Sequence, residues 1–190
     1  MFLLFAAVIG ILVGVALGGR FQNLGRLPLR WNVLVFLALA LQVLTFTPLN
    51  VLPWSLVPAL YLLSNGLAAA WVIRNLRVAG MPLIALGALS NLLAIVVNGG
   101  RMPVDRALLA RTRGEAFAEA VAGGRMPTNA VIANSHTHLI WLTDRLALPA
   151  PLPAPVVWSV GDLLIAAGVI WLIAAGMRRE QVRSDQKAAA

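Results

Sequence analysis

Five long runs of apolar residues dominate the chain, and they cover residues 2–19, 31–47, 54–73, 81–97 and 156–177. A helix that crosses the hydrocarbon core of a bilayer needs about 20 predominantly apolar residues. The pattern therefore predicts an all-α integral membrane protein with about five transmembrane helices. Four of these helices lie within residues 1–97, and the fifth occupies residues 156–177.

One long polar stretch, residues 98–155, separates the fourth run from the fifth. We expect this stretch to form a helical cap on the extracytoplasmic side. Asp105 is placed to begin one short helix, and Thr112 and Glu115 have the spacing of a capping box that starts a second helix.

The second half of the predicted cap has a different character. Residues 130–148 are moderately apolar, but they are too few and too polar for a complete span, so we interpret them as a re-entrant or interfacial helix. Alternating prolines within residues 149–155 then predict a stiff, extended connector to the fifth run.

The charges orient the predicted spans. Only 12% of the residues are charged, whereas a soluble domain has about 25%. Nine basic residues follow the first, third and fifth runs: Arg20, Arg26, Arg30, Arg74, Arg77, Arg178, Arg179, Arg183 and Lys187. The positive-inside rule makes this side cytoplasmic, with the N-terminus outside and a disordered basic tail over residues 178–190. Because these cations lie beside apolar runs, the net charge of +8 does not indicate nucleic-acid binding.

A repeated string marks the predicted cap. Gly-Gly-Arg-Met-Pro occurs at residues 99–103 and again at residues 123–127. A glycine pair exposes backbone N–H groups, and an arginine fork suits phosphate or carboxylate. The string therefore predicts an anion site at Arg101 and Arg125, although a repeated structural corner explains it as well.

Two carboxylates complete the predicted site. Asp162 lies about six residues inside the fifth predicted span, where an unpaired carboxylate is costly, so we expect an arginine or a polar partner for it. The site that we predict binds or translocates an anionic small solute or a lipid headgroup, without catalysis and without a cofactor. Its residues are Asn98, Gly99, Gly100, Arg101, Arg125, Asp144 and Asp162.

Two other classes of function stay open. The chain has no cysteine, so a metal-dependent hydrolase or transferase would have to use His136, His138 and Asp144. An accessory subunit or scaffold of a membrane complex is the third class, with a second copy or another membrane protein as its partner. The glycines Gly10, Gly14 and Gly18 form a face that would permit such a contact, but we favour packing within the bundle.

The order of motifs resembles a family of small bacterial polytopic membrane proteins of unknown function. The resemblance rests on Asn-Gly-Gly-Arg-Met-Pro from Asn98, on Thr-His-Leu-Ile-Trp-Leu-Thr-Asp from Thr137, and on Ser-Val-Gly-Asp from Ser159. It implies a multi-pass protein of the bacterial inner membrane and assigns no activity. Only the first Gly-Gly-Arg-Met-Pro copy falls at the family position, which favours Arg101 over Arg125.

Overall fold

The computed structural model describes residues 2–46, 53–124, 129–147 and 157–188. Arg125 and the predicted proline connector lie outside the described residues. Most of the described chain is helical, as expected. The five longest helices fall on the five apolar runs: α1 (Phe2–Ala16), α2 (Val33–Phe46), α3 (Val57–Arg74), α4 (Met81–Val97) and α7 (Val160–Ala188).

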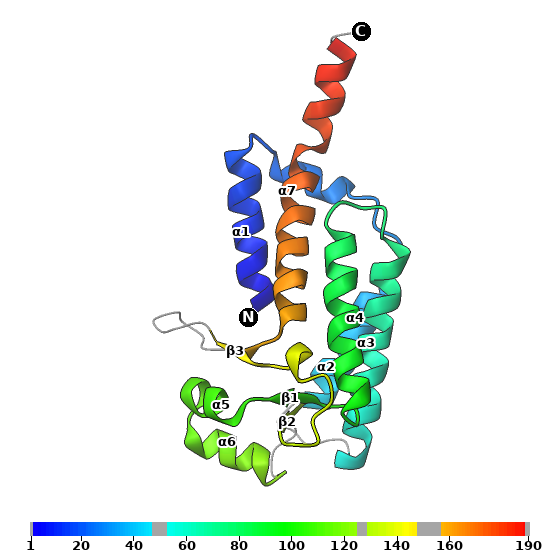
Figure 1. The fold of residues 1–190 in the computed structure, drawn as a ribbon. Coiled ribbons are helices and arrows are strands. Elements are labelled where there is room, and N and C mark those ends of the chain that lie inside the picture. Colours follow the sequence, from blue (N-terminus) through cyan, green and yellow to red (C-terminus); the bar gives the residue numbers. More distant parts are fainter. Residues whose placement is uncertain (1, 47–52, 125–128, 148–156, 189–190) are drawn as a thin grey trace.

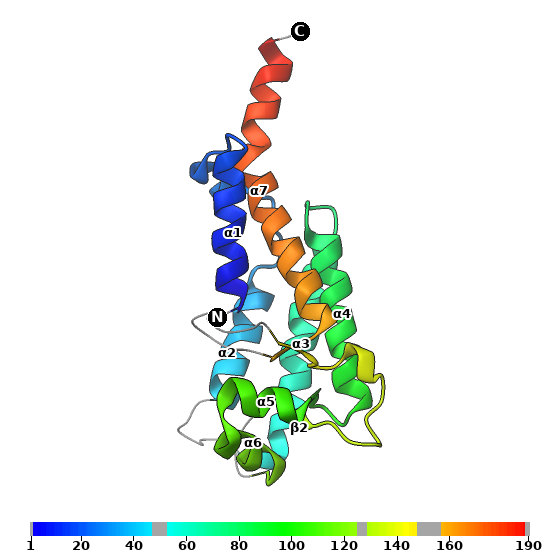
Figure 2. The ribbon, with the colours of Figure 1, turned by 60° about the vertical axis from the view of Figure 1, so that its left-hand side comes forward.

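The long helices lie side by side (Figure 1). Helix α7 packs between α1 and α4, and α3 packs between α4 and α2, which gives the spatial order α1, α7, α4, α3, α2. Turning the molecule brings α2 into view below α1 (Figure 2). Residues 178–188, which we expected to be a disordered tail, continue α7 as helix.

Among the described residues, two helices are long and apolar enough to cross a membrane, namely the 18-residue α3 and the 19 residues Val160–Arg178 of α7. Helices α1, α2 and α4 are also apolar but shorter. The structure therefore supports the helical class and two candidate spans.

Helices α4 and α7 approach so closely that their backbones touch. A Cβ atom added to Gly168 would lie 2.7 Å from the carbonyl oxygen of Gly80 and 2.8 Å from the Ile84 nitrogen. One on Gly161 would lie 2.7 Å from the Gly87 carbonyl oxygen. Each helix thus offers glycines to its partner at two levels, and no larger residue fits there.

The small face of α1 packs within the molecule, as the sequence favoured. A Cβ atom added to Gly10 would lie 3.0 Å from the Ile173 Cβ, and Gly14 faces Met177, so both glycines contact α7. Gly18, the next small residue along the chain, has a φ of +77° just after the end of α1.

A hydrogen-bonded network fixes the start of α7. The Ser159 N–H donates to Asp162 Oδ2 at 2.9 Å, and the Asp162 N–H donates to Ser159 Oγ at 3.0 Å. This reciprocal pair is a capping box with aspartate in the usual glutamate position. Asn91 of α4 joins it, because its Nδ2 donates to Asp162 Oδ1 at 2.9 Å and its Oδ1 accepts from Ser159 Oγ at 2.8 Å. The expectation that Asp162 lies six residues inside a span is wrong, since Asp162 is in the first turn of α7.

The remaining elements gather mostly at the end of the molecule opposite the α1–α2 and α3–α4 connections (Figure 1). We use the name cap only for the elements between α4 and α7, which are β1 (Met102–Val104), α5 (Arg106–Arg113), α6 (Glu115–Ala122), β2 (Ala130–Ile132), η3 (Ile140–Leu142), β3 (Leu146–Ala147) and β4 (Val157–Trp158). Two further 3₁₀ turns precede α2 and α3: η1 (Phe21–Arg26) and η2 (Trp54–Leu56).

Both predicted short helices form, with one correction to their caps. Asp105 caps α5 by accepting a hydrogen bond from the Leu108 N–H at 2.9 Å, as predicted. Thr112 does not cap α6. It lies within α5, and its hydroxyl donates to the Leu108 carbonyl at 2.9 Å. Gly114, with a φ of +93°, makes the corner between the two helices.

Residues 130–147 contain no α-helix, which corrects the expected re-entrant or interfacial helix. Strand β2 pairs in parallel with β1, with Met102 opposite Ala130. On the other side of β1, the Asp144 N–H donates to the Pro103 carbonyl at 2.9 Å. Because β1 takes a partner on each side, residues 130–132 and Asp144 are extended, and turns with the 3₁₀ helix Ile140–Leu142 connect them.

Replacing Gly87 with alanine tests the backbone contact between α4 and α7. The new Cβ would lie 2.8 Å from Ile165 Cγ1 and 2.9 Å from the Ile165 nitrogen, so the helices must separate. We expect Gly87→Ala to lower the free energy of unfolding by about 1–3 kcal/mol. Thermal unfolding in detergent, followed by circular dichroism, measures the loss.

Gly66→Ala is the matched control, because a Cβ on Gly66 of α3 would meet nothing within 4 Å. Alanine is the better helix former by up to about 1 kcal/mol, so this variant should unfold at an equal or higher temperature. Equal stability of the two alanine variants would contradict the proposed contact.

Candidate functional site

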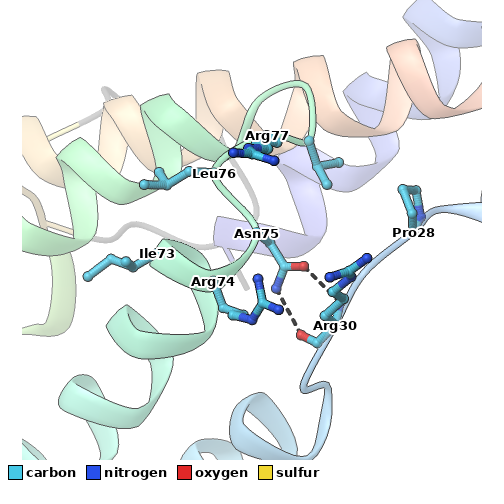
Figure 3. Close-up of a pocket in the computed structure, with 8 residues that line it drawn as sticks. Pro28, Arg30, Ile73, Arg74, Asn75, Leu76 and Arg77 are labelled. Carbon is cyan, nitrogen blue, oxygen red and sulfur yellow. Dashed lines mark hydrogen bonds between the residues drawn. The ribbon is translucent and has the colours of Figure 1, made fainter.

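Three arginines surround an open pocket at the end of the molecule that carries the α1–α2 and α3–α4 connections (Figure 3). Arg30 precedes α2, Arg74 ends α3, and Arg77 lies in the turn before α4. The volume of this basic pocket is about 680 Å³. Its other lining residues are Pro28, Ile73, Asn75, Leu76 and Val78.

Asn75 holds the two connections together. Its side chain is 3% exposed; its Oδ1 accepts from the Arg30 N–H at 2.8 Å, and its Nδ2 donates to the Arg30 carbonyl at 2.9 Å (Figure 3). The same Nδ2 donates to the Trp71 carbonyl at 2.8 Å. One buried amide therefore joins residue 30 to the end of α3, which brings the arginines of the two connections to one place.

Aromatic contacts add to this arrangement. The Arg74 guanidinium carbon lies 5.4 Å from the centre of the Trp31 ring, within the range of a cation–π interaction. Trp71 Nε1 donates to Asn32 Oδ1 at 3.1 Å. Both contacts again link the end of α3 with the chain just before α2.

The basic pocket has no internal counter-charge among the described residues. None of the guanidinium groups of Arg30, Arg74 and Arg77 forms an ion pair with a carboxylate whose side chain the structure describes. A cation in the last turn of a helix is favoured by the helix dipole, which explains Arg74 by itself. The dipole of one helix does not explain why three cations line one pocket.

From the sequence, these arginines indicate only the orientation of the chain in a membrane. The pocket depends on a contact between residues 30 and 75, which no local pattern reveals. The one local signal in the sequence is an asparagine between two arginines, in Arg74-Asn75-Leu76-Arg77. The structure shows that this asparagine is buried.

The structure places the predicted anion site at the opposite end of α4. Gly99 and Gly100 have φ values of +72° and +80° and end the helix. The N–H groups of Asn98 and Gly100 both donate to the Ile95 carbonyl, at 3.3 and 2.9 Å, so neither points to a ligand. Arg101 makes no hydrogen bond or ion pair with the described residues.

The first copy of the repeated string therefore acts as a structural corner. It ends α4 and leads directly into β1, and Gly124 with a φ of +62° follows the end of α6 in the second copy. The Asn98 side chain holds a neighbouring loop, because its Oδ1 accepts from the His138 N–H at 2.9 Å and its Nδ2 donates to the His138 carbonyl at 3.0 Å. An anion site at Arg101 stays a prediction.

The Asp144 carboxyl forms no ion pair with Arg101 among the described residues, and it lines a small cavity within the cap. The cavity has a volume of about 130 Å³, and its other lining residues are Val104, Leu109, Arg113, Phe117, Asn129, Ala130 and Val157. The Asp144 carboxyl makes no hydrogen bond or ion pair with the described residues. Burial first, and then the nearby negative charge of Asp162, raise the pKa of Asp144 to about 8.

Among the described residues, no group of three or more histidine and carboxylate side chains is placed to hold a metal ion. His136 and His138 are exposed in a turn, where the His136 N–H donates to Asn134 Oδ1 at 2.8 Å. Asp144 faces the small cavity instead of joining these imidazoles.

Comparison with known proteins gives one match. A family model described as a family of unknown function (DUF5317) matches residues 26–174, which include the whole basic pocket and Asp144. The search of curated proteins and the search of solved structures found no match. These comparisons assign no ligand and no activity to the basic pocket.

Asp144 makes the stability of the protein depend on pH. Its pKa is higher in the folded state than the ordinary value of 3.8, so the folded state holds a proton that the unfolded state releases. The resulting stability is fully present below about pH 4 and is lost as the pH rises to about 8, by at most about 1.4 kcal/mol per pH unit. We expect Asp144→Asn to flatten the pH dependence of the unfolding midpoint in this window.

The measurement is thermal unfolding in detergent between pH 5 and pH 9. Glu119→Gln, which removes an exposed carboxylate from α6, is the control and should leave the pH dependence of the parent protein unchanged. The same slope in Asp144→Asn and in the parent would mean that Asp144 is ionised in the folded state at neutral pH.

Proposed function

We propose that this chain, which belongs to the family of unknown function DUF5317, is an integral membrane protein that binds a phosphate-bearing anionic headgroup in the basic pocket. The observation that carries the proposal is the presence of Arg30, Arg74 and Arg77 around one open pocket, without a described carboxylate partner. The proposal agrees with the sequence in the kind of ligand, an anion. It differs in the site, which is the basic pocket at one end of α4 and not Arg101 at the other end.

The placement in a membrane is supported by the surface of the helices. Leu12, Phe36 and Leu86 of α1, α2 and α4 are 63%, 67% and 57% exposed. A large contiguous apolar surface is costly in water and marks an interaction site or a membrane. We propose that all five long helices span the bilayer, the shorter ones by local thinning of the lipid.

The orientation follows from the charges. The nine basic residues of the positive-inside pattern lie at one end of the molecule (Figure 1). They belong to the connection before α2, to the end of α3 with the connection that follows it, and to the C-terminal part of α7. This end faces the cytoplasm in our proposal, and the cap faces outside. The basic pocket then lies at the level of the cytoplasmic headgroups.

Arginine is the residue suited to this ligand. Its planar guanidinium stays charged and offers two parallel N–H groups that match the oxygens of a phosphate. Because Asn75 and Trp31 hold Arg30 and Arg74 near each other, little ordering is needed when an anion binds.

A lipid headgroup fits the pocket better than a free anion. Beside the arginines, the pocket is lined by Ile73 and Leu76, which are 49% and 41% exposed. An apolar edge next to a cationic centre matches a phosphate that is attached to a glycerol and its acyl chains. Inorganic phosphate or glycerol phosphate would use only the arginines.

Binding of phosphatidic acid to the purified chain in mild detergent tests the proposal. Each arginine near a lipid phosphate contributes about 1 kcal/mol, so the double variant Arg30→Gln, Arg77→Gln should bind phosphatidic acid about thirtyfold more weakly. Microscale thermophoresis measures the dissociation constant, and detergent solution removes any effect of the substitutions on membrane orientation.

Arg111→Gln is the control for charge, because Arg111 is exposed on α5 at the other end of the molecule. It should bind as tightly as the parent protein. Equal affinity of the double variant and Arg111→Gln would contradict the proposal. Glycerol 3-phosphate and inorganic phosphate form the second arm, and full competition by either at similar concentration would identify a free anion as the ligand.

A further inference from the structure

A short segment of the cap exposes apolar side chains at the surface of the molecule. Trp141 in η3 is 79% exposed, and Leu139 just before it is 44% exposed. Trp141 is the most exposed large hydrophobic side chain among the described residues. The 3₁₀ turn η3 lies beside the end of α4 that enters the cap (Figure 2).

The segment is held rigidly in this position. Both backbone groups of His138 bond to the Asn98 side chain, which fixes one end to α4. At the other end, Leu142 packs against Tyr61, Ile95 and Met102. The Leu142 N–H donates to the Leu139 carbonyl at 2.8 Å, and the Thr143 hydroxyl donates to the Ile140 carbonyl at 2.7 Å.

The conformation of Leu139 is part of this arrangement. It has a φ of +48°, in the left-handed region that a leucine rarely adopts. Such a conformation persists only where the surrounding structure determines it, and here the anchored residues on both sides do so. The exposed side chains of Leu139 and Trp141 are therefore held in place and do not belong to a loose loop.

The apolar surface of the helices continues onto this segment. The turn η3 contacts both α4 and α7. Near it, Leu93 and Val96 at the end of α4 are 48% and 54% exposed, and Val160 at the start of α7 is 44% exposed. A bilayer that covers these helix ends would reach η3.

Arg145 gives the segment a polar edge. Its guanidinium carbon lies 5.7 Å from the centre of the Trp141 ring. Tryptophan is enriched at membrane interfaces because its ring is apolar and its N–H is polar, and a neighbouring cation can reach lipid phosphates. The chemistry of the segment matches the boundary between acyl chains and headgroups.

We propose that Leu139 and Trp141 insert into the outer interfacial layer of the bilayer around α4 and α7, with Arg145 at the level of the lipid phosphates. This inference rests on the membrane-spanning part of the proposed function and is independent of the basic pocket. It gives residues 138–145 a specific partner, a phospholipid surface, which anchors the cap against the membrane.

Single labelling sites test the proposal directly, because the chain has no cysteine. Trp141→Cys and Leu139→Cys are each labelled with the environment-sensitive dye NBD. The labelled full chain is reconstituted into vesicles of phosphatidylcholine and phosphatidylglycerol. Quenching by lipids with a nitroxide on the acyl chain is compared with quenching by aqueous iodide.

Two control sites calibrate the result. Leu86→Cys reports an exposed position in the middle of α4, and Ala116→Cys reports an exposed position on α6. We expect the labels at 139 and 141 to resemble the label at 86, with several-fold stronger quenching by nitroxide lipid than the label at 116.

Two other results would contradict the inference. Labels at 139 and 141 that iodide quenches as strongly as the label at 116, while the label at 86 is protected, would overturn the inference alone. An iodide-accessible label at 86 would overturn the membrane-spanning part of the proposed function and the inference with it. Circular dichroism of each variant checks folding, and the two sites provide independent readings.

Discussion

The contact between α4 and α7 is the constraint on which the rest of the structure depends. Glycines at two levels of each helix bring the two backbones together, and the contact leaves no room for a Cβ atom. In the membrane placement that we propose, helices gain little from burying apolar surface against each other, so close backbone packing and hydrogen bonds hold them together. Helix α7 also packs against α1, while α4 packs against α3, which in turn packs against α2. The contact between α4 and α7 therefore joins both parts of the molecule.

The two ends of the contact between α4 and α7 differ in what their polar side chains do. At one end, Ser159 and Asp162 form the N-terminal capping box of α7, and Asn91 bonds to both, so the start of α7 is held against α4. At the other end, the turn before α4 brings Arg77 beside the end of α3, where Asn75 attaches Arg30. Asp162, which the sequence placed in the binding site, therefore stabilises the start of α7, whereas three arginines that the sequence linked only to orientation surround a pocket.

Much of the fold could be predicted from the sequence, because hydrophobic length is a local property. The five apolar runs became five long helices, and Asp105 begins a helix as expected. The glycine pair at 99 and 100 ends α4, which matches the structural corner that was the alternative to an anion site. The errors lie where long-range pairing overrides local pattern. Residues 130–147 are moderately apolar, yet pairing with β1 makes residues 130–132 and Asp144 extended, and turns with η3 lie between them. Thr112 has capping-box spacing, yet α5 continues past it.

The sequence by itself determined the helical class, the placement of the apolar helices and the sorting of basic residues, since each depends on the residue types within one stretch of chain. The candidate site could not be obtained in this way. Contacts between residues far apart in the chain decide whether Arg30 and Arg74 line one pocket and whether Asn91 bonds to Asp162. They also decide whether the Trp141 side chain is exposed. Only the tertiary structure decides such contacts, because the packing of α4 against α7 fixes which distant segments become neighbours.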